Sequence, residues 1–281
     1  MFFMVQIYGN FICQIINLRQ VMKVTFLGTG TSQGVPVIGC KCLVCASSNP
    51  QDKRLRTSAL VQAAGQNIVI DSGPDFRQQM LTAQLDRLDG LVFTHAHKDH
   101  IAGLDDIRGF NFVQRKAIDV YCTDAVEQQM RTEFAYIFAE IKYPGVPELN
   151  MHTIHPDANF EIGEIAITPI EVMHYKLPVL GFKFNEPANS NTFVYITDAN
   201  FISSAEIDKM RGCHTLVLNA LRHEKHISHY TLQEALAVIA EVNPQRAYLT
   251  HISHQLGVQT EVEATLPPNV FLAYDGLTIE L

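Results

Sequence analysis

The segment 94–100, which reads Thr-His-Ala-His-Lys-Asp-His, constrains this chain more than any other stretch. Apolar residues 91–93 precede it and predict a short buried strand, while residues 101–104 after it predict the start of a helix. Four side chains able to bind a metal therefore crowd the exit of one strand. A solvated polar turn that happens to be rich in histidine is the other interpretation.

The order of these four side chains suits two adjacent metal ions. His95 and His97 alternate as neighbours on a strand do, so both side chains leave the same side of an extended backbone. Asp99 and His100 lie in the turn beyond and can face a second point. Imidazole nitrogens and carboxylate oxygens accept Zn, Mn or Fe, so the ligand types do not select one metal.

Three further candidate ligands end predicted strands elsewhere in the chain. His174, Asp198 and His251 each follow an apolar stretch. A single histidine at a strand end is more often structural than functional. Together with the motif at 94–100, however, these residues make seven candidate ligands, which is enough for two ions that share a carboxylate and a water.

Three of the six cysteines, Cys40, Cys42 and Cys45, lie within six positions of one another. This spacing favours a metal site over disulfides that span loops, with surface thiols or a redox motif as the alternative. It also predicts a reducing, cytoplasmic location. The remaining cysteines are scattered and predict ordinary core or surface thiols.

The pattern along the chain predicts two mixed sheets packed face to face and covered by helices, in one α/β domain. The expected helices span residues 76–85, 124–139, 203–210 and 231–242. Residues 143–160 are expected to be irregular. The expected strands span residues 24–27, 58–62, 67–70, 91–93, 118–122, 164–172, 181–184, 192–196, 215–219, 246–250, 270–273 and 277–280.

Two observations argue against nucleic acid and nucleotide binding. The formal net charge of −8 disfavours a broad docking surface for a polyanion, so no stable nucleic-acid complex is expected. The glycine-rich loop at 28–34 leads into the cysteine cluster and not into a helix, so the dinucleotide and P-loop patterns both fail. A small phosphorylated substrate stays compatible with the charge, because bound cations would offset it locally.

Residues 1–21 are expected to be an N-terminal extension to a domain at 22–281, because Met22 opens a clean strand pattern and could be the natural start. The extension is apolar but too short and too interrupted to span a bilayer, and no membrane association is expected, with a segment that touches a membrane surface as the alternative. Its apolar residues and the stretch 109–112 would permit a homodimer.

These features resemble the metallo-β-lactamase superfamily of metal-dependent hydrolases over residues 22–281. The resemblance implies an αββα sandwich. It also implies that one metal is held by His95, His97 and His174, the other by Asp99, His100 and His251, and that Asp198 bridges them. A true β-lactamase typically has a cysteine at the bridging position, so the aspartate favours the phosphodiesterase and thioesterase branches.

Within the superfamily the chain is most similar to the PhnP-type phosphodiesterases of the carbon–phosphorus lyase pathway. The similarity is carried by the glycine loop with the cysteine cluster and by the segments 103–108, 250–254 and 273–276. It implies a structural zinc bound by Cys40, Cys42, Cys45 and His254. Such a Cys₃His set is a closed tetrahedral site.

The same resemblance assigns two further roles. His229 matches a histidine that contacts the scissile phosphate, just before a helix that Thr231 or Ser228 could cap. Asp99 would orient the attacking hydroxide. Independently of the resemblance, the position of Asp71 at a predicted strand end suggests that it fixes a ligand imidazole or satisfies backbone N–H groups. The neighbouring residues His223 and His226 are expected to be packing or surface residues.

The resulting hypothesis is a dinuclear metal-dependent phosphodiesterase. A metal-bridging hydroxide would attack a small, cyclic phosphodiester. Three alternatives stay open: a transfer-RNA 3′-processing nuclease, a thioester hydrolase of the glyoxalase II kind, and a cofactor-biosynthesis factor, such as the pyrroloquinoline quinone accessory protein, that does not hydrolyse anything.

Overall fold

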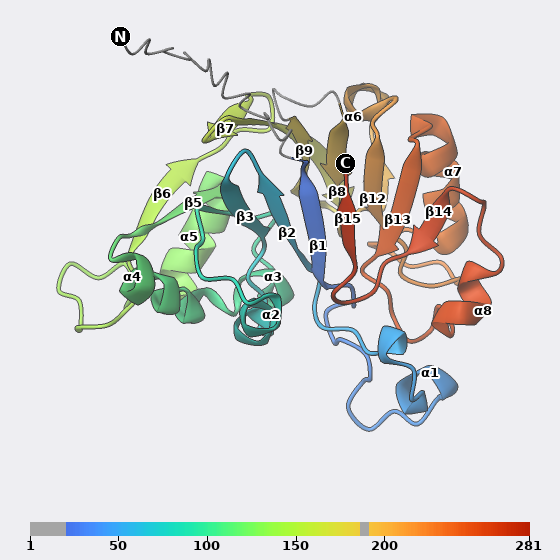
Figure 1. Cartoon of the computed structure of the whole chain (residues 1–281), viewed down its shortest axis with the longest axis horizontal. Helices are drawn as coiled ribbons and strands as arrows, with labels where there is room; N and C mark the ends of the chain where they lie inside the picture. The colour runs from blue at the N-terminus through green and yellow to red at the C-terminus, as the bar shows by residue number, and fades with distance from the viewer. Residues whose placement is uncertain (1–20, 186–190) are drawn as a thin grey trace, which may run out of the picture.

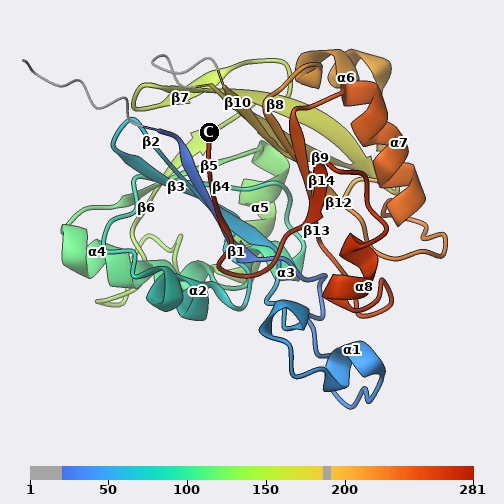
Figure 2. The same cartoon turned by 45° about the vertical axis from the view of Figure 1, so that its right-hand side comes forward.

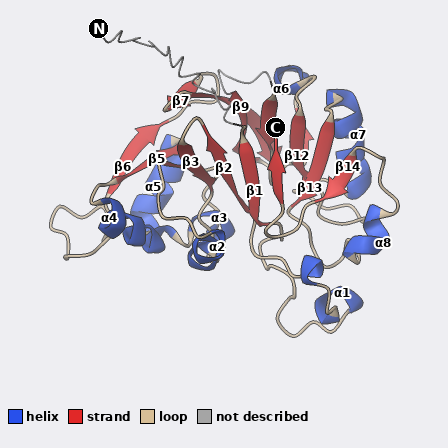
Figure 3. Ribbon diagram, in the orientation of Figure 1, coloured by secondary structure: helices blue, strands red, loops and turns tan. Residues whose placement is uncertain are grey.

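Two β-sheets pack face to face, and helices cover the outer face of each (Figures 1 and 3). The computed structural model describes residues 21–185 and 191–281; except for Val21, the predicted N-terminal extension lies outside the described residues. The arrangement is the predicted αββα sandwich.

The first sheet has seven strands and is mixed. Its first four strands pair antiparallel and its last three continue in parallel. In spatial order they are β15 (Thr278–Glu280), β1 (Lys23–Gly28), β2 (Ser58–Ala63), β3 (Gln66–Ile70), β4 (Gly90–Val92), β5 (Ile118–Cys122) and β6 (Leu149–Thr153).

The second sheet has eight strands and is also mixed. The long hairpin of β8 and β9 forms one part of it, and three parallel strands that follow β10 form the other. In spatial order the strands are β11 (Phe201–Ile202), β8 (Ile165–His174), β9 (Leu177–Asn185), β10 (Thr192–Tyr195), β12 (Thr215–Asn219), β13 (Arg246–Thr250) and β14 (Val270–Leu272), while β7 (Phe160–Ile162) pairs with β8.

The helices are short and lie mainly outside the two sheets (Figure 2). None that the structure describes is both long enough and apolar enough to cross a lipid bilayer. They are α1 (Leu43–Ala46), α2 (Phe76–Ala83), α3 (Lys98–Ile101), α4 (Arg108–Gln114), α5 (Asp124–Glu133), α6 (Ser204–Met210), α7 (Leu232–Val242) and α8 (Gln259–Glu263), with 3₁₀ turns at Pro50–Asp52 and Leu104–Ile107.

Three apolar clusters match the four layers. The first cluster lies between the two sheets and contains Ile68 and Ile70 of β3. The second lies between the first sheet and the helices α2, α4 and α5, and it contains Val69 of β3. The third cluster lies between the second sheet and the helices α6 and α7. Successive side chains of β3 thus enter opposite buried layers, which is the period of two expected of a strand covered on both faces.

Several predicted boundaries were wrong. The helix expected over 124–139 ends at Glu133, since Phe134 leaves helical geometry and Ile137 turns into the core beside α5. The region expected to be irregular contains β6, whose side chains are mostly exposed or half-exposed and therefore give no apolar pattern. The helix expected to begin at Ile101 begins at Lys98, inside the histidine motif.

Candidate metal centres and active site

The loops that follow four strands meet at one edge of the sandwich. One leaves β4 and carries residues 94–100, His174 is the last residue of β8, Asp198 follows β10, and His251 directly follows β13. The structure brings the seven candidate ligands together in two groups, and within each group the ligand atoms lie within 4.8 Å of one another. The groups are His95, His97 and His174, and Asp99, His100, Asp198 and His251.

Hydrogen bonds to Thr94 fix the tautomer of His95. The Thr94 hydroxyl donates to Asp71 Oδ2 at 2.8 Å, so it can only accept from His95 Nδ1 at 2.9 Å. His95 Nε2 then carries the lone pair, and this buried atom has no hydrogen-bond partner. Burial and the neighbouring His100 lower the pKa of His95 well below its ordinary value. A neutral imidazole with a buried, unpartnered lone pair is the form that binds a metal.

The other two histidines of this group complete a convergent set. His174 Nδ1 donates to the Ser228 carbonyl at 2.8 Å, so its Nε2 also carries a lone pair. The His97 ring lies 4.6 Å from that of His95 and 5.0 Å from that of His174. His97 was expected on a strand, but β4 ends at Val92 and the backbone of His97 is extended without being paired.

The second group combines two carboxylates with two histidines. His100 Nε2 lies 3.2 Å from Asp99 Oδ2 and 3.3 Å from Asp198 Oδ2, and His251 Nδ1 lies 3.2 Å from the same Asp198 oxygen. His100 Nδ1 contacts Asp71 Oδ2 at 2.7 Å. No lysine or arginine of the described residues pairs with the carboxylates of Asp71, Asp99 and Asp198.

Electrostatics show that this group suits a cation. Burial alone would lower the pKa of His100, but the carboxylates of Asp198, Asp71 and Asp99 raise it well above its ordinary value. Burial would raise the pKa of Asp198, but His251 and His100 hold it well below its ordinary range. Three carboxylates collected around one imidazole in a buried place are therefore deficient in positive charge, which a divalent ion would supply.

Asp71 connects the two groups. It contacts His100 directly and reaches His95 through the Thr94 hydroxyl, while its other oxygen accepts the Thr94 backbone N–H at 2.9 Å. Both interpretations suggested by the sequence, an orienting carboxylate and an acceptor of backbone N–H groups, thus describe contacts that are present.

Three residues of the site have strained backbones. Asp71, Asp198 and His251 have φ angles of 62°, 57° and 55°, which place non-glycine residues in the left-handed region. Such conformations cost about 1–3 kcal/mol each and are found where function requires a particular side-chain direction. Each one turns the chain sharply just beyond a strand and aims its side chain at the site.

His229 lies beside the shared carboxylate. Its Nε2 is 3.1 Å from Asp198 Oδ1, and its Nδ1 is 3.0 Å from both Ser228 Oγ and His226 Nδ1. His226 was expected to be a packing or surface residue, and the half-buried ring packs directly against His229. His223 fits that expectation, since its Nε2 bonds the Leu256 carbonyl at 2.8 Å.

The cysteine cluster forms a separate group. The sulfur atoms of Cys40, Cys42 and Cys45 and a ring nitrogen of His254 lie within 4.8 Å of one another. His254 Nδ1 is 3.5 Å from Cys40 Sγ and 3.3 Å from Cys42 Sγ. The Cys45 backbone N–H and His254 lower the pKa of Cys42 to about 6. A thiolate of low pKa beside two more sulfurs and an imidazole matches the donor set of a closed zinc site.

Backbone pairing links the cysteine loop to the active-site edge, although α1 projects from the sandwich (Figure 2). Gly30 pairs with Ile252, the residue between His251 and the loop that carries His254. The Thr31 hydroxyl lies 3.3 Å from His251 Nε2, and the Thr31 N–H donates to the Ile252 carbonyl at 3.1 Å. A metal at the cysteine group would therefore stabilise the backbone that aims His251.

We expect Cys42→Ser to lower metal occupancy at the active-site groups as well as at the cysteine group, and to reduce thermal stability. The serine hydroxyl is a poor zinc ligand, and the freed loop would no longer restrain His251. Elemental analysis of purified protein measures the occupancy. The control is Lys41→Ser in the same exposed loop. Normal active-site occupancy in a folded Cys42→Ser protein would contradict the coupling.

A family model described as a beta-lactamase superfamily domain matches residues 66–252. The chain belongs to this superfamily. A solved superfamily structure described as a new diphosphatase from the PhnP family is 36% identical, covers 93% of this chain and 97% of its own, and has a TM-score of 0.85. The resemblance predicted from the sequence is thereby confirmed.

Two curated relatives have other names. The chain is 39% identical over 91% of its length to 51% of an octanoyltransferase from Porphyromonas gingivalis. It is 28% identical over 51% of its length to 48% of a ribonuclease Z from a Bradyrhizobium species. The chain thus spans about half the length of the curated relatives that it matches. Superfamily membership alone therefore does not select a substrate.

Proposed function

We propose that this chain is a metal-dependent phosphodiesterase that acts on a small, cyclic phosphodiester. The observation that carries the proposal is the position of Asp198. Its carboxylate belongs to one ligand group, lies in contact distance of His100 and His251, and shares a further cluster with His174 and His229. A carboxylate between two groups of ligands suits a pair of ions that act on one phosphoryl group.

Two divalent ions, Zn, Mn or Fe, would be held by the residues assigned from the sequence. His95, His97 and His174 would hold one, Asp99, His100 and His251 the other, and Asp198 would bridge them. When bound, the pair would polarise the phosphoryl oxygens and lower the pKa of an attacking water. The cysteine group with His254 would hold a structural zinc.

The chain's own residues would orient the reactants and move protons. His229 presents Nε2 at the shared carboxylate, so a substrate phosphoryl group at that place would meet an imidazole able to donate a hydrogen bond or a proton to a phosphate or leaving oxygen. Ser228 and His226 at Nδ1 would hold the ring in position. The Asp99 carboxylate would orient the attacking water.

Thioester hydrolysis is the second candidate. It was an alternative from the sequence, and the 39% identity to half of a protein named octanoyltransferase is compatible with chemistry on an acyl group. Acyl and phosphoryl electrophiles both respond to polarised oxygens and an activated water, so the ligand set alone does not separate them. A ribonuclease role has weaker support, because the net charge of −8 opposes a grip on RNA phosphates.

Parallel assays on metal-quantified protein test these proposals. The substrates are bis(p-nitrophenyl) phosphate, 2′,3′-cyclic nucleotides, a diphosphate diester, a glutathione thioester and an octanoyl thioester. We expect turnover of the phosphodiesters that disappears with chelator and returns with added metal. Turnover of thioesters only would overturn the phosphodiesterase proposal. The absence of turnover with every one of these substrates would favour a binding role in cofactor biosynthesis.

A further inference from the structure

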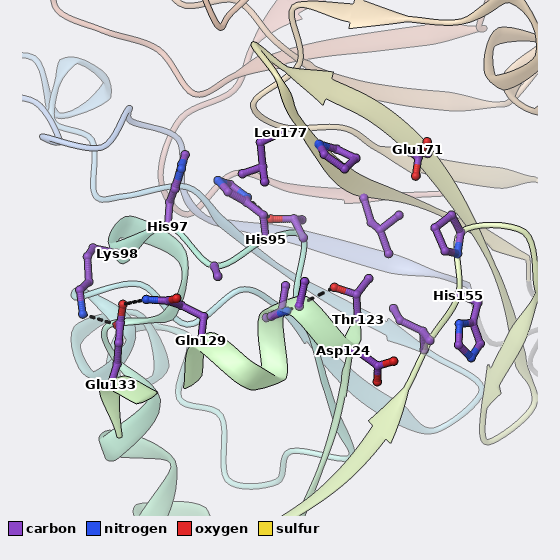
Figure 4. A pocket seen from close by; sticks show the side chains of 18 residues that line it. His95, His97, Lys98, Thr123, Asp124, Gln129, Glu133, His155, Glu171 and Leu177 are labelled. Carbon is purple, nitrogen blue, oxygen red and sulfur yellow. Dashed lines mark hydrogen bonds and ion pairs between the residues drawn. The ribbon is translucent and has the colours of Figure 1, made fainter. Parts of the chain in front are cut away.

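A cavity of about 710 Å³ opens beside the first ligand group, between α5 and the hairpin of β8 and β9 (Figure 4). His95 and His97 are among the residues that line it. Its volume is in the range of small-molecule sites. A substrate whose phosphorus lies at the metal ligands would therefore direct one of its substituents into this space.

Much of the cavity wall is apolar. Val126 of α5 contributes from the side of the first sheet, Ile154 from the end of β6, and Leu177, Pro178 and Leu180 from β9. The Leu180 N–H donates to the Thr94 carbonyl at 3.0 Å, which ties β9 to the residue before His95. Burial of an alkyl or aryl group against such a wall is favourable at about 25 cal/mol per Å².

The charged residues at the wall are mainly acidic. Asp124, Glu133 and Glu171 line the cavity, and the cation beside them is Lys98. Lys98 Nζ is already paired with Glu133, and it lies 5.9 Å from the centre of the Phe134 ring. No arginine of the described residues lines the cavity. A second anionic group of a substrate would thus lose water beside two carboxylates, those of Asp124 and Glu171, that no lysine or arginine of the wall pairs with.

We propose that this cavity binds an uncharged, apolar ester group of the substrate and selects against a substituent that carries a second negative charge. The proposal rests on the proposed function and adds to it an apolar alkyl or aryl substituent beside the reacting phosphodiester group.

The test uses p-nitrophenyl phosphodiesters that share one chromophore and differ in the second ester group, which is ethyl, octyl or ω-carboxyheptyl. We expect kcat/KM to be at least about tenfold higher for octyl than for ethyl, because six more methylene groups are buried. We expect the carboxyheptyl ester to fall about tenfold below octyl. Equal values for all three esters would overturn the cavity assignment and leave the phosphodiesterase proposal standing.

Charge reversal at the wall gives a matched pair of variants. Glu171→Lys should raise kcat/KM for the carboxyheptyl ester several-fold relative to octyl. Glu161→Lys makes the same change at an exposed residue of β7 outside the cavity and should leave the ratio unchanged. Ala125→Trp, at an exposed position of the wall in the first turn of α5, should reduce the octyl-to-ethyl ratio towards one. An identical ratio in both lysine variants would contradict the proposal.

A binding measurement separates this inference from the proposed activity. Calorimetry of the metal-loaded protein with octylphosphonate and ethylphosphonate requires no turnover. Tighter binding of octylphosphonate by about tenfold or more, lost in Ala125→Trp, supports the apolar site even if no diester is hydrolysed. Equal affinities would overturn it even if every diester is hydrolysed.

Discussion

Replacing His229 with alanine is expected to lower kcat for phosphodiester hydrolysis about 10²- to 10⁴-fold, the range for a lost general acid or hydrogen-bond donor. His229 Nε2 lies 3.1 Å from Asp198 Oδ1, at the place where the two ligand groups meet. The imidazole is outside both predicted ligand sets, so the metal content should stay unchanged. Steady-state kinetics per bound metal, with elemental analysis of the same sample, measures both quantities.

His223→Ala is the matched control, because His223 lies in the same loop but its Nε2 bonds the Leu256 carbonyl and not the Asp198 carboxylate. It should leave turnover per bound metal unchanged. His226→Ala should have an intermediate effect, since the Ser228 hydroxyl still contacts His229 Nδ1 at 3.0 Å. If His229→Ala lost metal in proportion to activity, His229 would be a ligand through its cluster with His174 and Asp198.

Three of the candidate ligands could be predicted because each one lies at or just beyond the end of a strand. His174, Asp198 and His251 follow apolar runs that predict strands well, and strands of two packed sheets bring their ends to a common edge. The dense motif at 94–100 supplied the rest. Strand positions depend on local apolar patterns, so they are readable without a structure.

The partners of the ligands could not be predicted in the same way. Thr94 orients His95 through a hydroxyl whose proton goes to Asp71, and no spacing rule contains that information. His226 is three residues before His229, but only the loop geometry turns both rings towards each other. Asp75 occupies the N-cap position of α2, yet its carboxylate makes no capping bond and accepts from the backbone and side chain of Arg56. Contacts between distant segments decide these roles.

Arg54 is the buried charge that sequence reasoning missed. Its guanidinium donates to Thr29 Oγ1 at 2.8 Å and to the Ala273 carbonyl at 2.6 Å, and it also bonds Gln259. The Thr29 hydroxyl in turn donates to Asp275 Oδ1 at 2.7 Å. This network ties the glycine loop to the C-terminal segment 273–276. The Thr29 carbonyl also accepts the backbone N–H of the residue after His251 at 2.9 Å.

Arg54→Met is expected to destabilise the protein by about 3–5 kcal/mol, because removing one member of a buried charged network leaves its partners without a donor. Urea denaturation followed by circular dichroism measures the loss. Arg56→Met is the matched control two residues away, since Arg56 is partly exposed and its ion pair with Asp75 should contribute no more than about 1 kcal/mol. Equal losses in the two variants would contradict the role of the Arg54 network.

The loss of unfolding free energy caused by Arg54→Met should also depend on pH. Burial raises the pKa of Asp275 to about 6, against the opposing effects of the Leu55 N–H, the Thr29 hydroxyl and the Arg54 charge. A carboxyl whose pKa is higher in the folded than in the unfolded state destabilises the fold as pH rises through the folded value. Without the Arg54 charge the pKa of Asp275 rises further. The unfolding free energy of the wild-type protein therefore stops falling near pH 6, whereas that of the variant continues to fall above pH 6. The difference in unfolding free energy between the two proteins should therefore be larger at pH 8 than at pH 6. A constant difference would show that the pKa of Asp275 does not depend on the Arg54 charge.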